Sequence, residues 1–174
     1  MGKQKTFLID LDNCIFRFDS QSELRKRLEK NISEWVRIKF NCSFSRSEEI
    51  KNQLYSKYGG APECFLKASI INTKEELAEC IMAINNITKT RILPDQRLQR
   101  TLGIIKGELC LYTNSPINYA EKVLSSLGSR KKFSRIFDIT YNNFLFKSDP
   151  SIYTILKEKA NINLSIVTMV DDSL

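Results

Sequence analysis

The chain has 174 residues, of which 42% are apolar and 27% charged, so it can bury a core as one domain or as one domain with an inserted lobe. Its formal charge of +7, from 27 basic and 20 acidic residues, favours anionic partners such as phosphate esters or nucleic acid, although a solvated basic surface explains it equally well. The lack of histidine excludes a histidine-based nucleophile relay, and five scattered cysteines without a C-x-x-C pair disfavour a zinc site.

The N-terminal residues, MGKQKT, predict an intracellular protein. They lack the apolar core of a signal peptide, and no stretch of the chain approaches 18 uninterrupted apolar residues. Gly2 fits the loose pattern for N-myristoylation, but a strand is expected to start almost at once and leaves little free arm. We therefore expect a protein of the cytoplasm or nucleus with reduced cysteines and no membrane partner.

The stretch from Thr6 to Phe16 is expected to be the centre of the fold. Its apolar residues from Thr6 to Ile9 are continuous rather than alternating, which is typical of a strand buried on both faces of a parallel sheet. Asp10 and Asp12 follow where this strand ends, and ligands bind in the crevice beyond the carboxyl ends of such strands. A lone Asp-x-Asp is more often a turn or a cap, so its meaning depends on the rest of the chain.

Residues 17–90 show only helical patterns. In the first part, apolar residues recur at three- and four-residue intervals with basic residues between them, which predicts an amphipathic helix. Ser45 is expected to cap a second helix, because Glu48 three residues later completes a capping box. The block therefore predicts an all-helical insert. Its expected helices cover residues 24–36, 45–58, 62–71 and 73–85.

An α/β alternation resumes at residue 91. Short strands are expected at residues 108–112, 137–141 and 165–170, and helices are expected to start near residues 95, 117 and 150. Strands that alternate with helices predict a parallel, three-layer sheet with right-handed crossovers. The expected α/β domain thus comprises residues 1–16 and 91–174, and the helical insert comprises residues 17–90.

Polar side chains of particular kinds follow three of the predicted strands, and one lysine precedes the last helix. Because the carboxyl ends of parallel strands lie at one edge of a sheet, these side chains are expected to converge. The four aspartates would repel one another unless a cation were present, and oxygen ligands with room for water suit Mg²⁺. The residues are Asp10, Asp12, Thr113, Asn114, Lys147, Asp171 and Asp172.

This set of residues has the chemistry of phosphoryl transfer. An ionised Asp10 can attack phosphorus, and Asp12 can protonate the departing oxygen if crowding and burial raise its pKa. The Thr113 hydroxyl and the Lys147 ammonium can bind the phosphoryl oxygens as charge builds. A magnesium ion held by Asp10 and one acid of the final pair would screen the attack of one anion on another.

Four stretches, DLDNCIF, LYTNS, FKSDPSIY and TMVDDS, resemble in order the four motifs of the haloacid dehalogenase (HAD) superfamily of phosphatases. The DxDN opening, the helical insert and the TN and VDDS forms are most similar to the pyrimidine 5′-nucleotidase group. LEKNISEWVRIKFNCS and SEEIKNQLYSKYGGA also resemble the cap of that group. The resemblance implies a Rossmann-like core, a C1-type helical cap that closes over the substrate, and Mg²⁺ as cofactor.

The same resemblance implies a role for each motif residue. It makes Asp10 the nucleophile and Asp12 the acid/base. The phosphate-binding residues would be Thr113, Asn114 and Lys147, and the metal ligands would come from Asp10, Asp12, Asp171 and Asp172. The function that we expect is Mg²⁺-dependent hydrolysis of a small phosphomonoester, such as a nucleoside monophosphate, through an aspartyl-phosphate. Cap residues, for example from 55–65, would select the substrate.

Three departures from the family pattern leave an alternative open. Cys14 replaces the threonine common after DxDN, and Ser148 stands where proline usually follows the lysine. The chain also stops at Leu174, directly after the acidic pair, whereas relatives continue with a helix and a strand. The alternative is a truncated or catalytically weak protein of this fold with a binding or regulatory role.

Two further alternatives are disfavoured. A phospho-receiver domain also gathers acids, threonine and lysine at strand ends, but it has no place for the helical insert. Its phosphate-accepting aspartate should also end a middle strand, where only Thr113 and Asn114 are expected. Nucleic-acid binding depends on charge alone, because the densest basic cluster, at residues 130–135, has one aromatic, Phe133. Such a cluster lacks the interleaved aromatic residues of a single-strand-binding surface.

Overall fold

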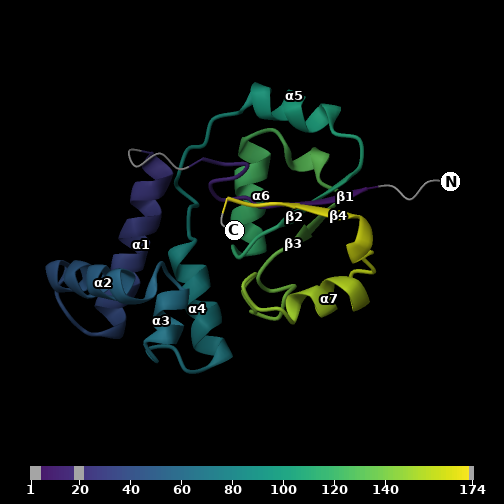
Figure 1. Cartoon of the computed structure of the whole chain (residues 1–174). Coiled ribbons are helices and arrows are strands. Elements are labelled where there is room, and N and C mark those ends of the chain that lie inside the picture. The colour runs from purple at the N-terminus through teal and green to yellow at the C-terminus, as the bar shows by residue number, and fades with distance from the viewer. Residues whose placement is uncertain (1–4, 18–21, 173–174) are drawn as a thin grey trace. The chain divides into compact units, whose positions relative to one another are not determined.

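The computed structural model describes residues 5–17 and 22–172 (Figure 1). The chain groups into two compact units, an α/β unit of residues 1–18 and 92–174 and a helical unit of residues 19–91. The domain boundaries expected after residues 16 and 90 stay a prediction. Gly2, the residue of the myristoylation pattern, and Leu174 lie outside the described residues. None of the described helices is long and apolar enough to cross a membrane.

Four parallel strands form the sheet of the α/β unit, in the order β3-β2-β1-β4. Helices lie on both faces of this sheet, which confirms the predicted three-layer α/β fold (Figure 1). The strands are β1 (Thr6–Ile9), β2 (Glu108–Tyr112), β3 (Arg135–Phe137) and β4 (Val167–Val170). The helices are α5 (Gln96–Ile104), α6 (Ile117–Ser126) and α7 (Ile152–Glu158), with short 3-10 turns η1 (Arg130–Lys132) and η2 (Leu164–Ile166).

The continuous apolar run of β1 is explained by its place inside the sheet. β1 pairs with β2 on one side and with β4 on the other, so that Leu8 lies beside Cys110 and Met169. Leu8 packs in one core cluster with Ile152 and Leu156 of α7. Ile9, whose side chain points to the opposite face, is only 5% exposed, so the strand is buried on both faces and an alternating polar pattern would not be tolerated.

The third strand ends earlier than its sequence predicts, and the prediction of a strand at 137–141 was wrong. Its β-branched and aromatic residues favour a strand, but Asp138 is only 4% exposed and uses its carboxylate to form a turn. That carboxylate accepts hydrogen bonds from the Thr140 hydroxyl and from the backbone N–H of Tyr141. It also accepts from the backbone N–H of Ile117 at 2.9 Å, so the turn fixes the start of α6.

Several other element bounds also differ from prediction. The helix predicted over 62–71 is shorter, and residues before β4 form η2 instead of extending the strand. The helix expected to open at Asp149 begins at Ile152, because the Asp149 carboxylate accepts from both the backbone and the hydroxyl of Ser151. At η2 the Asn163 side chain likewise accepts from the backbone and the hydroxyl of Ser165, so in both places a local polar contact replaces regular pairing.

Helices alone make up the described part of the helical unit, as the sequence pattern predicts. α1 packs against α2 and α4, and the buried face of α1 includes Leu24, Ile32 and Val36. The matching face of α4 includes Leu77, Ile81 and Ile84. The helices are α1 (Glu23–Lys39), α2 (Phe44–Tyr58), α3 (Glu63–Lys67) and α4 (Lys74–Ile84).

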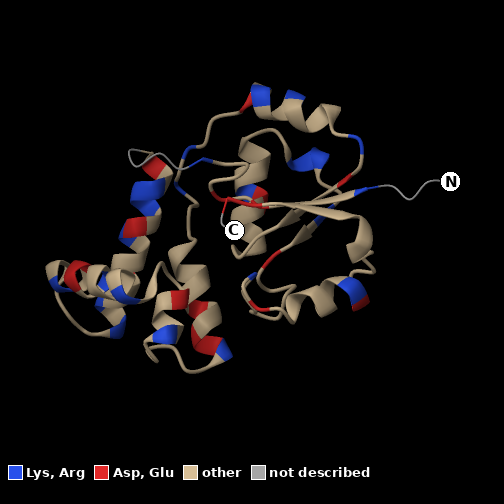
Figure 2. Cartoon of the chain, viewed as in Figure 1, with Lys and Arg blue, Asp and Glu red and all other residues tan. Residues whose placement is uncertain are grey.

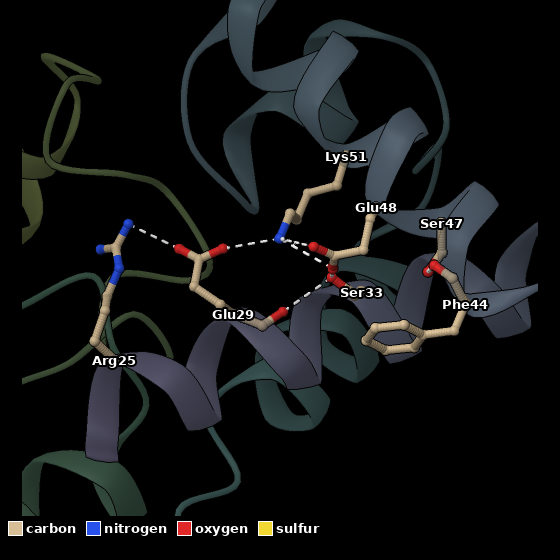
Figure 3. A network of polar contacts seen from close by, with 7 residues as sticks. All are labelled: Arg25, Glu29, Ser33, Phe44, Ser47, Glu48 and Lys51. Carbon is tan, nitrogen blue, oxygen red and sulfur yellow. Dashed lines mark hydrogen bonds and ion pairs between the residues drawn. The ribbon is translucent and has the colours of Figure 1, made fainter. Parts of the chain in front are cut away.

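The capping residue of α2 is Ser43 rather than Ser45. The Ser43 hydroxyl accepts from the backbone N–H of Arg46 at 3.3 Å, which satisfies one of the free donors at the helix start. Glu48 is then too far along the helix to complete a capping box. Its carboxylate instead joins a polar network between α1 and α2 (Figure 3).

Lys51 is the centre of this network. Its side chain is only 6% exposed, and its ammonium lies 3.1 Å from Glu29 Oε2 and 3.2 Å from Glu48 Oε1 (Figure 3). The buried Ser33 hydroxyl donates to Glu48, and Arg25 holds the other oxygen of Glu29. A buried ammonium is tolerated only with such partners, so the network ties α2 to α1.

We expect replacement of Lys51 with methionine to lower the free energy of unfolding by about 2 kcal/mol. Breaking a buried ion pair costs about 3–5 kcal/mol of unfolding free energy. The cost is smaller here because Glu29 and Glu48 are partly exposed, so water can solvate their carboxylates once the ammonium is removed. Denaturant unfolding followed by circular dichroism measures the change. Arg46→Met on the same helix is the control, because its pair with Glu49 is exposed and should change stability by under about 0.5 kcal/mol.

Candidate active site

Neighbouring strands bring the first and last acidic residues together. Ile9 pairs in register with Val170, and the backbone N–H of Asp10 donates to the Val170 carbonyl oxygen at 2.9 Å. Asp10 and Asp171, the residues that directly follow these two, therefore lie side by side at the carboxyl ends of β1 and β4. Figure 2 shows acidic residues gathered at this edge of the sheet. Carboxylate oxygens of Asp10, Asp171 and Asp172 all lie within 4.8 Å of one another.

Lys147 lies between two of these acids. Its ammonium donates to Asp10 Oδ1 and to Asp171 Oδ2, the latter at 2.8 Å. All three side chains are largely buried, with 12% of Lys147, 9% of Asp10 and 4% of Asp171 exposed. The lysine thus partly neutralises a group of carboxylates that would otherwise repel one another strongly.

Burial raises the pKa of Asp10 to about 6, although the Lys147 ammonium opposes this effect. The neighbouring Asp171 and Asp12 carboxylates raise it further. At neutral pH Asp10 is therefore mostly ionised, as a nucleophile requires, but it is held in a site that favours additional positive charge.

The Asp12 carboxylate is held by two hydroxyl groups. The Ser115 hydroxyl donates to Oδ2 and the Tyr119 hydroxyl donates to Oδ1, each at 2.7 Å. Burial raises the pKa of Asp12, and the two hydrogen bonds oppose this increase. Burial and the nearby Asp12 in turn raise the pKa of Tyr119, which keeps that hydroxyl a donor. An acid with a raised pKa and a fixed orientation suits proton transfer.

Asn114 and Thr113 contact the backbone of the same region. The Asn114 side-chain oxygen accepts from the backbone N–H of Lys147 at 3.0 Å, which fixes the start of the lysine loop. Thr113 is 1% exposed, and its hydroxyl accepts from the backbone N–H of Ser115 at 3.0 Å. The segment after β2 therefore orients both Lys147 and the residue that holds Asp12.

The structure brings all seven predicted site residues together. Lys147 contacts Asp10, Asp171 and the Asn114 side chain. Thr113 and Asp12 both contact Ser115, and Asp172 lies close to the carboxylates of Asp10 and Asp171. Asp12 lies outside the group of three close carboxylates, because its oxygens face Ser115 and Tyr119. Sequence reasoning missed these two partners. Ser115 belongs to the LYTNS stretch, and Tyr119 follows it by one helical turn, so a search for donors at i and i+4 would have found both.

Cys14 does not have the environment of a reactive thiolate. Burial and the carboxylates of Asp10, Asp171 and Asp172 raise the pKa of its thiol, although Lys147 opposes them. The Cys14 sulfur donates to the Val170 carbonyl oxygen at 3.7 Å. A nucleophilic cysteine needs the opposite electrostatic balance, so Cys14 is not a candidate nucleophile.

In the densest basic cluster of the sequence, at residues 130–135, two of the four basic residues are paired with acids. Arg130 pairs with Glu121 and Arg135 pairs with Glu108. Phe133, the aromatic residue of the cluster, is only 3% exposed and offers no ring for stacking on a base. The prediction that nucleic acid is not a partner remains untested, but this cluster gives no support for one.

The three close carboxylates fit a hard divalent cation. They offer only oxygen atoms, they come from two adjacent strand ends, and two of them are held by a single lysine. Few protein oxygens with space for water are typical of Mg²⁺ sites. The fit depends on Asp10, Asp171 and Asp172, since the Asp12 carboxylate is engaged elsewhere.

Comparison with known proteins gives a family match and several structural matches. A family model described as haloacid dehalogenase-like hydrolase matches residues 4–174. No curated protein matches the chain. Among solved structures, a HAD phosphatase from Thermococcus onnurineus is 18% identical, with 98% of this chain and 78% of that chain covered at a TM-score of 0.54.

Two further structures have the same fold at low identity. A haloacid dehalogenase-like family hydrolase from Xanthomonas campestris is 13% identical, with 99% of this chain and 76% of that chain covered at a TM-score of 0.54. A HAD-hydrolase from Bacillus subtilis, solved bound to magnesium, is 14% identical, with 99% and 81% covered at a TM-score of 0.50. Dehalogenases are also among the matches.

Proposed function

The chain belongs to the haloacid dehalogenase-like hydrolases, and from this membership we propose that it is a Mg²⁺-dependent phosphomonoester hydrolase that acts through an aspartyl-phosphate on Asp10. The observation that carries the proposal is the contact of one lysine with two buried acids. Lys147 bridges Asp10 and Asp171, which lie at the ends of adjacent strands. A carboxylate held beside a cation in this way is suited to attack an anionic phosphate ester.

In the first step a carboxylate oxygen of Asp10 attacks phosphorus, and the bond from phosphorus to the ester oxygen breaks. Asp12 gives its proton to the departing oxygen, which leaves as an alcohol. In the second step a water molecule attacks the phosphorus of the aspartyl-phosphate and gives a proton to Asp12. Phosphate leaves, and the Asp10 carboxylate is regenerated. Lys147 and the Thr113 hydroxyl would hold the phosphoryl oxygens throughout.

Asp10, Asp171 and Asp172 would hold Mg²⁺. When bound, the ion supplies positive charge that reduces repulsion between the attacking carboxylate and the phosphate. The magnesium-bound hydrolase from Bacillus subtilis supports this choice of ion. The helical unit would serve as the cap over the site, with residues near 55–65 selecting a nucleoside monophosphate or a similar small phosphometabolite.

Leaving-group chemistry favours phosphate transfer over dehalogenation. Halide is a weak base and departs without a proton, whereas the alkoxide of a phosphate ester needs one. Asp12, with its raised pKa and two hydroxyl partners, provides a proton donor that dehalogenation would not use.

The phospho-receiver alternative was disfavoured partly because only Thr113 and Asn114 were expected after a middle strand. This argument was wrong, because β1 is an inner strand of the sheet and Asp10 follows it. The family match over residues 4–174 favours the hydrolase instead.

A phosphatase screen tests the proposal. The full chain is incubated with para-nitrophenyl phosphate and a panel of metabolite phosphates, with Mg²⁺ and with a chelator, and released phosphate is measured. We expect release that depends on Mg²⁺ and a phosphorylated Asp10 peptide after acid quench. Halide release from 2-haloacids without phosphate release would overturn it in favour of a dehalogenase. Binding of a phosphate ester without turnover would favour the regulatory alternative.

We expect Tyr119→Phe to lower kcat about 10- to 100-fold and to leave KM nearly unchanged. The variant removes a hydrogen bond to a charged group, worth about 1.5–3 kcal/mol, and frees Asp12 to rotate. Steady-state kinetics on para-nitrophenyl phosphate measures both constants. Tyr112→Phe is the matched control, because Tyr112 is also buried and its hydroxyl faces the Asn142 side chain rather than a carboxylate of the site. Equal effects of the two variants would argue against a positioning role.

We expect Mg²⁺ affinity to be constant above pH 7 and to fall about tenfold per pH unit below pH 6. The reason is that Asp10 has a pKa of about 6 in the ion-free protein, and a proton there competes with the metal. Isothermal titration calorimetry at several pH values measures this dependence. In Asp10→Asn the slope should disappear between pH 5 and 7, and a wild-type affinity independent of pH in that window would contradict the assignment.

A further inference from the structure

The helical unit contains a small pocket between α1 and the segment that follows α4. Its volume is about 190 Å³, which equals the space of about six water molecules. Every residue that lines it is polar. The lining residues are Arg27, Asn31, Asn86, Thr88 and Lys89.

Local hydrogen bonds fix the uncharged walls of this pocket. The Asn31 amide donates to the carbonyl oxygens of Ile84 and Asn86, at 3.1 and 2.9 Å. The Asn86 side-chain oxygen accepts from the hydroxyl and the backbone N–H of Thr88. These contacts join α1 to residues 84–88, so the uncharged side of the pocket has a fixed geometry, whereas Arg27 is half-buried and Lys89 is exposed.

Two cations line the pocket, and no acid does. Arg27 comes from α1, and Lys89 lies 62 positions further along the chain. Within the described part of the chain, neither forms an ion pair with an acid, although most other basic residues of α1 and α2 do. Those paired residues include Arg25, Arg37, Lys39, Arg46 and Lys51. Two like charges at one pocket favour an anion there.

We propose that this pocket binds an oxyanion of the size of phosphate, either free inorganic phosphate or the phosphate group of a larger molecule. A planar guanidinium and an ammonium are the usual partners of such a group, and the volume admits a phosphate with water but not a whole nucleotide. The proposal does not depend on the proposed function of the α/β unit.

A larger pocket on the same unit is less suited to an anion. It measures about 600 Å³ and includes two carboxylates, Glu29 and Glu48, among its lining residues. Both face Lys51 in the network of Figure 3. An anion there would meet acids that are already fixed, whereas the pocket at Arg27 has none.

Nuclear magnetic resonance of the full chain tests the proposal. Amide chemical shifts are followed as inorganic phosphate or glycerol phosphate is added at constant ionic strength, with sodium chloride as the reference anion. We expect saturable shifts at residues 27–31 and 86–89, and binding there at least about tenfold weaker in Arg27→Gln/Lys89→Gln. Tighter binding of inorganic phosphate indicates a site for the free ion, and tighter binding of glycerol phosphate indicates a site for the phosphate group of a larger molecule. Either result supports the proposed site.

Matched variants separate this site from general charge and from the proposed active site. Arg46→Gln/Lys57→Gln changes the charge of the same unit equally and should leave the shifts unchanged, whereas Arg27→Lys/Lys89→Arg should retain binding. Shifts at residues 113–115 report the proposed active site separately. No saturable shift at residues 27–31 and 86–89, or shifts that persist in Arg27→Gln/Lys89→Gln, would overturn the proposal.

Discussion

Asp10→Asn is expected to lower phosphatase turnover by at least about 10⁴-fold while the protein stays folded. The amide has nearly the same shape as the carboxylate but cannot attack phosphorus or form the aspartyl-phosphate. The charged form of Asp10 is disfavoured by burial and by its acidic neighbours. The variant loses the ion pair with Lys147, which lowers stability. It also removes the repulsion between Asp10 and the neighbouring carboxylates, so we expect the net loss of stability to be small.

Released phosphate and the mass of the quenched Asp10 peptide measure this effect. The wild-type peptide should gain one phosphoryl group during turnover, and the Asp10→Asn peptide should not. Asp149→Asn is the control, because Asp149 is a partly exposed aspartate whose carboxylate contacts only the nearby Ser151 in the hydrogen bonds described. It should keep activity within about twofold. Wild-type rates in Asp10→Asn would exclude the aspartyl-phosphate mechanism.

Lys147→Met is expected to have the second largest effect, on both catalysis and stability. Removal of the cation leaves Asp10 and Asp171 buried beside one another, and breaking such a pair costs about 3 kcal/mol of unfolding free energy. Loss of a charge that stabilises the transition state lowers kcat about 10²- to 10³-fold. Methionine keeps the unbranched side chain as far as the ε position, so both effects report mainly the loss of the charge.

Thermal unfolding with and without Mg²⁺ distinguishes this electrostatic account from a packing defect. A metal ion that binds Asp10, Asp171 and Asp172 supplies the missing positive charge, so Mg²⁺ should stabilise Lys147→Met more than the wild type. Lys157→Met, an exposed lysine on α7, should unfold and turn over as the wild type does. If Mg²⁺ stabilised both proteins equally, the three carboxylates would not be its ligands.

The sequence predicted the parts of the fold that depend on burial and periodicity. The continuous apolar run of β1 indicated an inner strand, and the three- and four-residue spacing of α1 indicated an amphipathic helix. Both patterns arise from contact with a core, so one sequence is enough to show them. The convergence of Asp10 with Asp171 followed from the same logic, because parallel strands share one edge for their carboxyl ends.

Local polar contacts could not be predicted in the same way. Ser43 and Ser45 are both suitable caps by composition, and the choice between them depends on how Glu48 contacts Ser33 and Lys51 of the packed helices. The turn at Asp138 likewise depends on the position of the α6 N-terminus. Such contacts join segments far apart in sequence, so no short pattern records them.

The pairing of Ile9 with Val170 also limits how the site could change during evolution. The separation of the Asp10 and Asp171 main chains is that of adjacent strands, about 4.8 Å, and is therefore independent of loop sequence. An insertion of one residue before β4 that shifted its pairing would turn Asp171 to the opposite face and present its neighbour instead. Lineages can thus vary loops that carry no site residue, but the hydrogen-bond register of this strand pair must be kept.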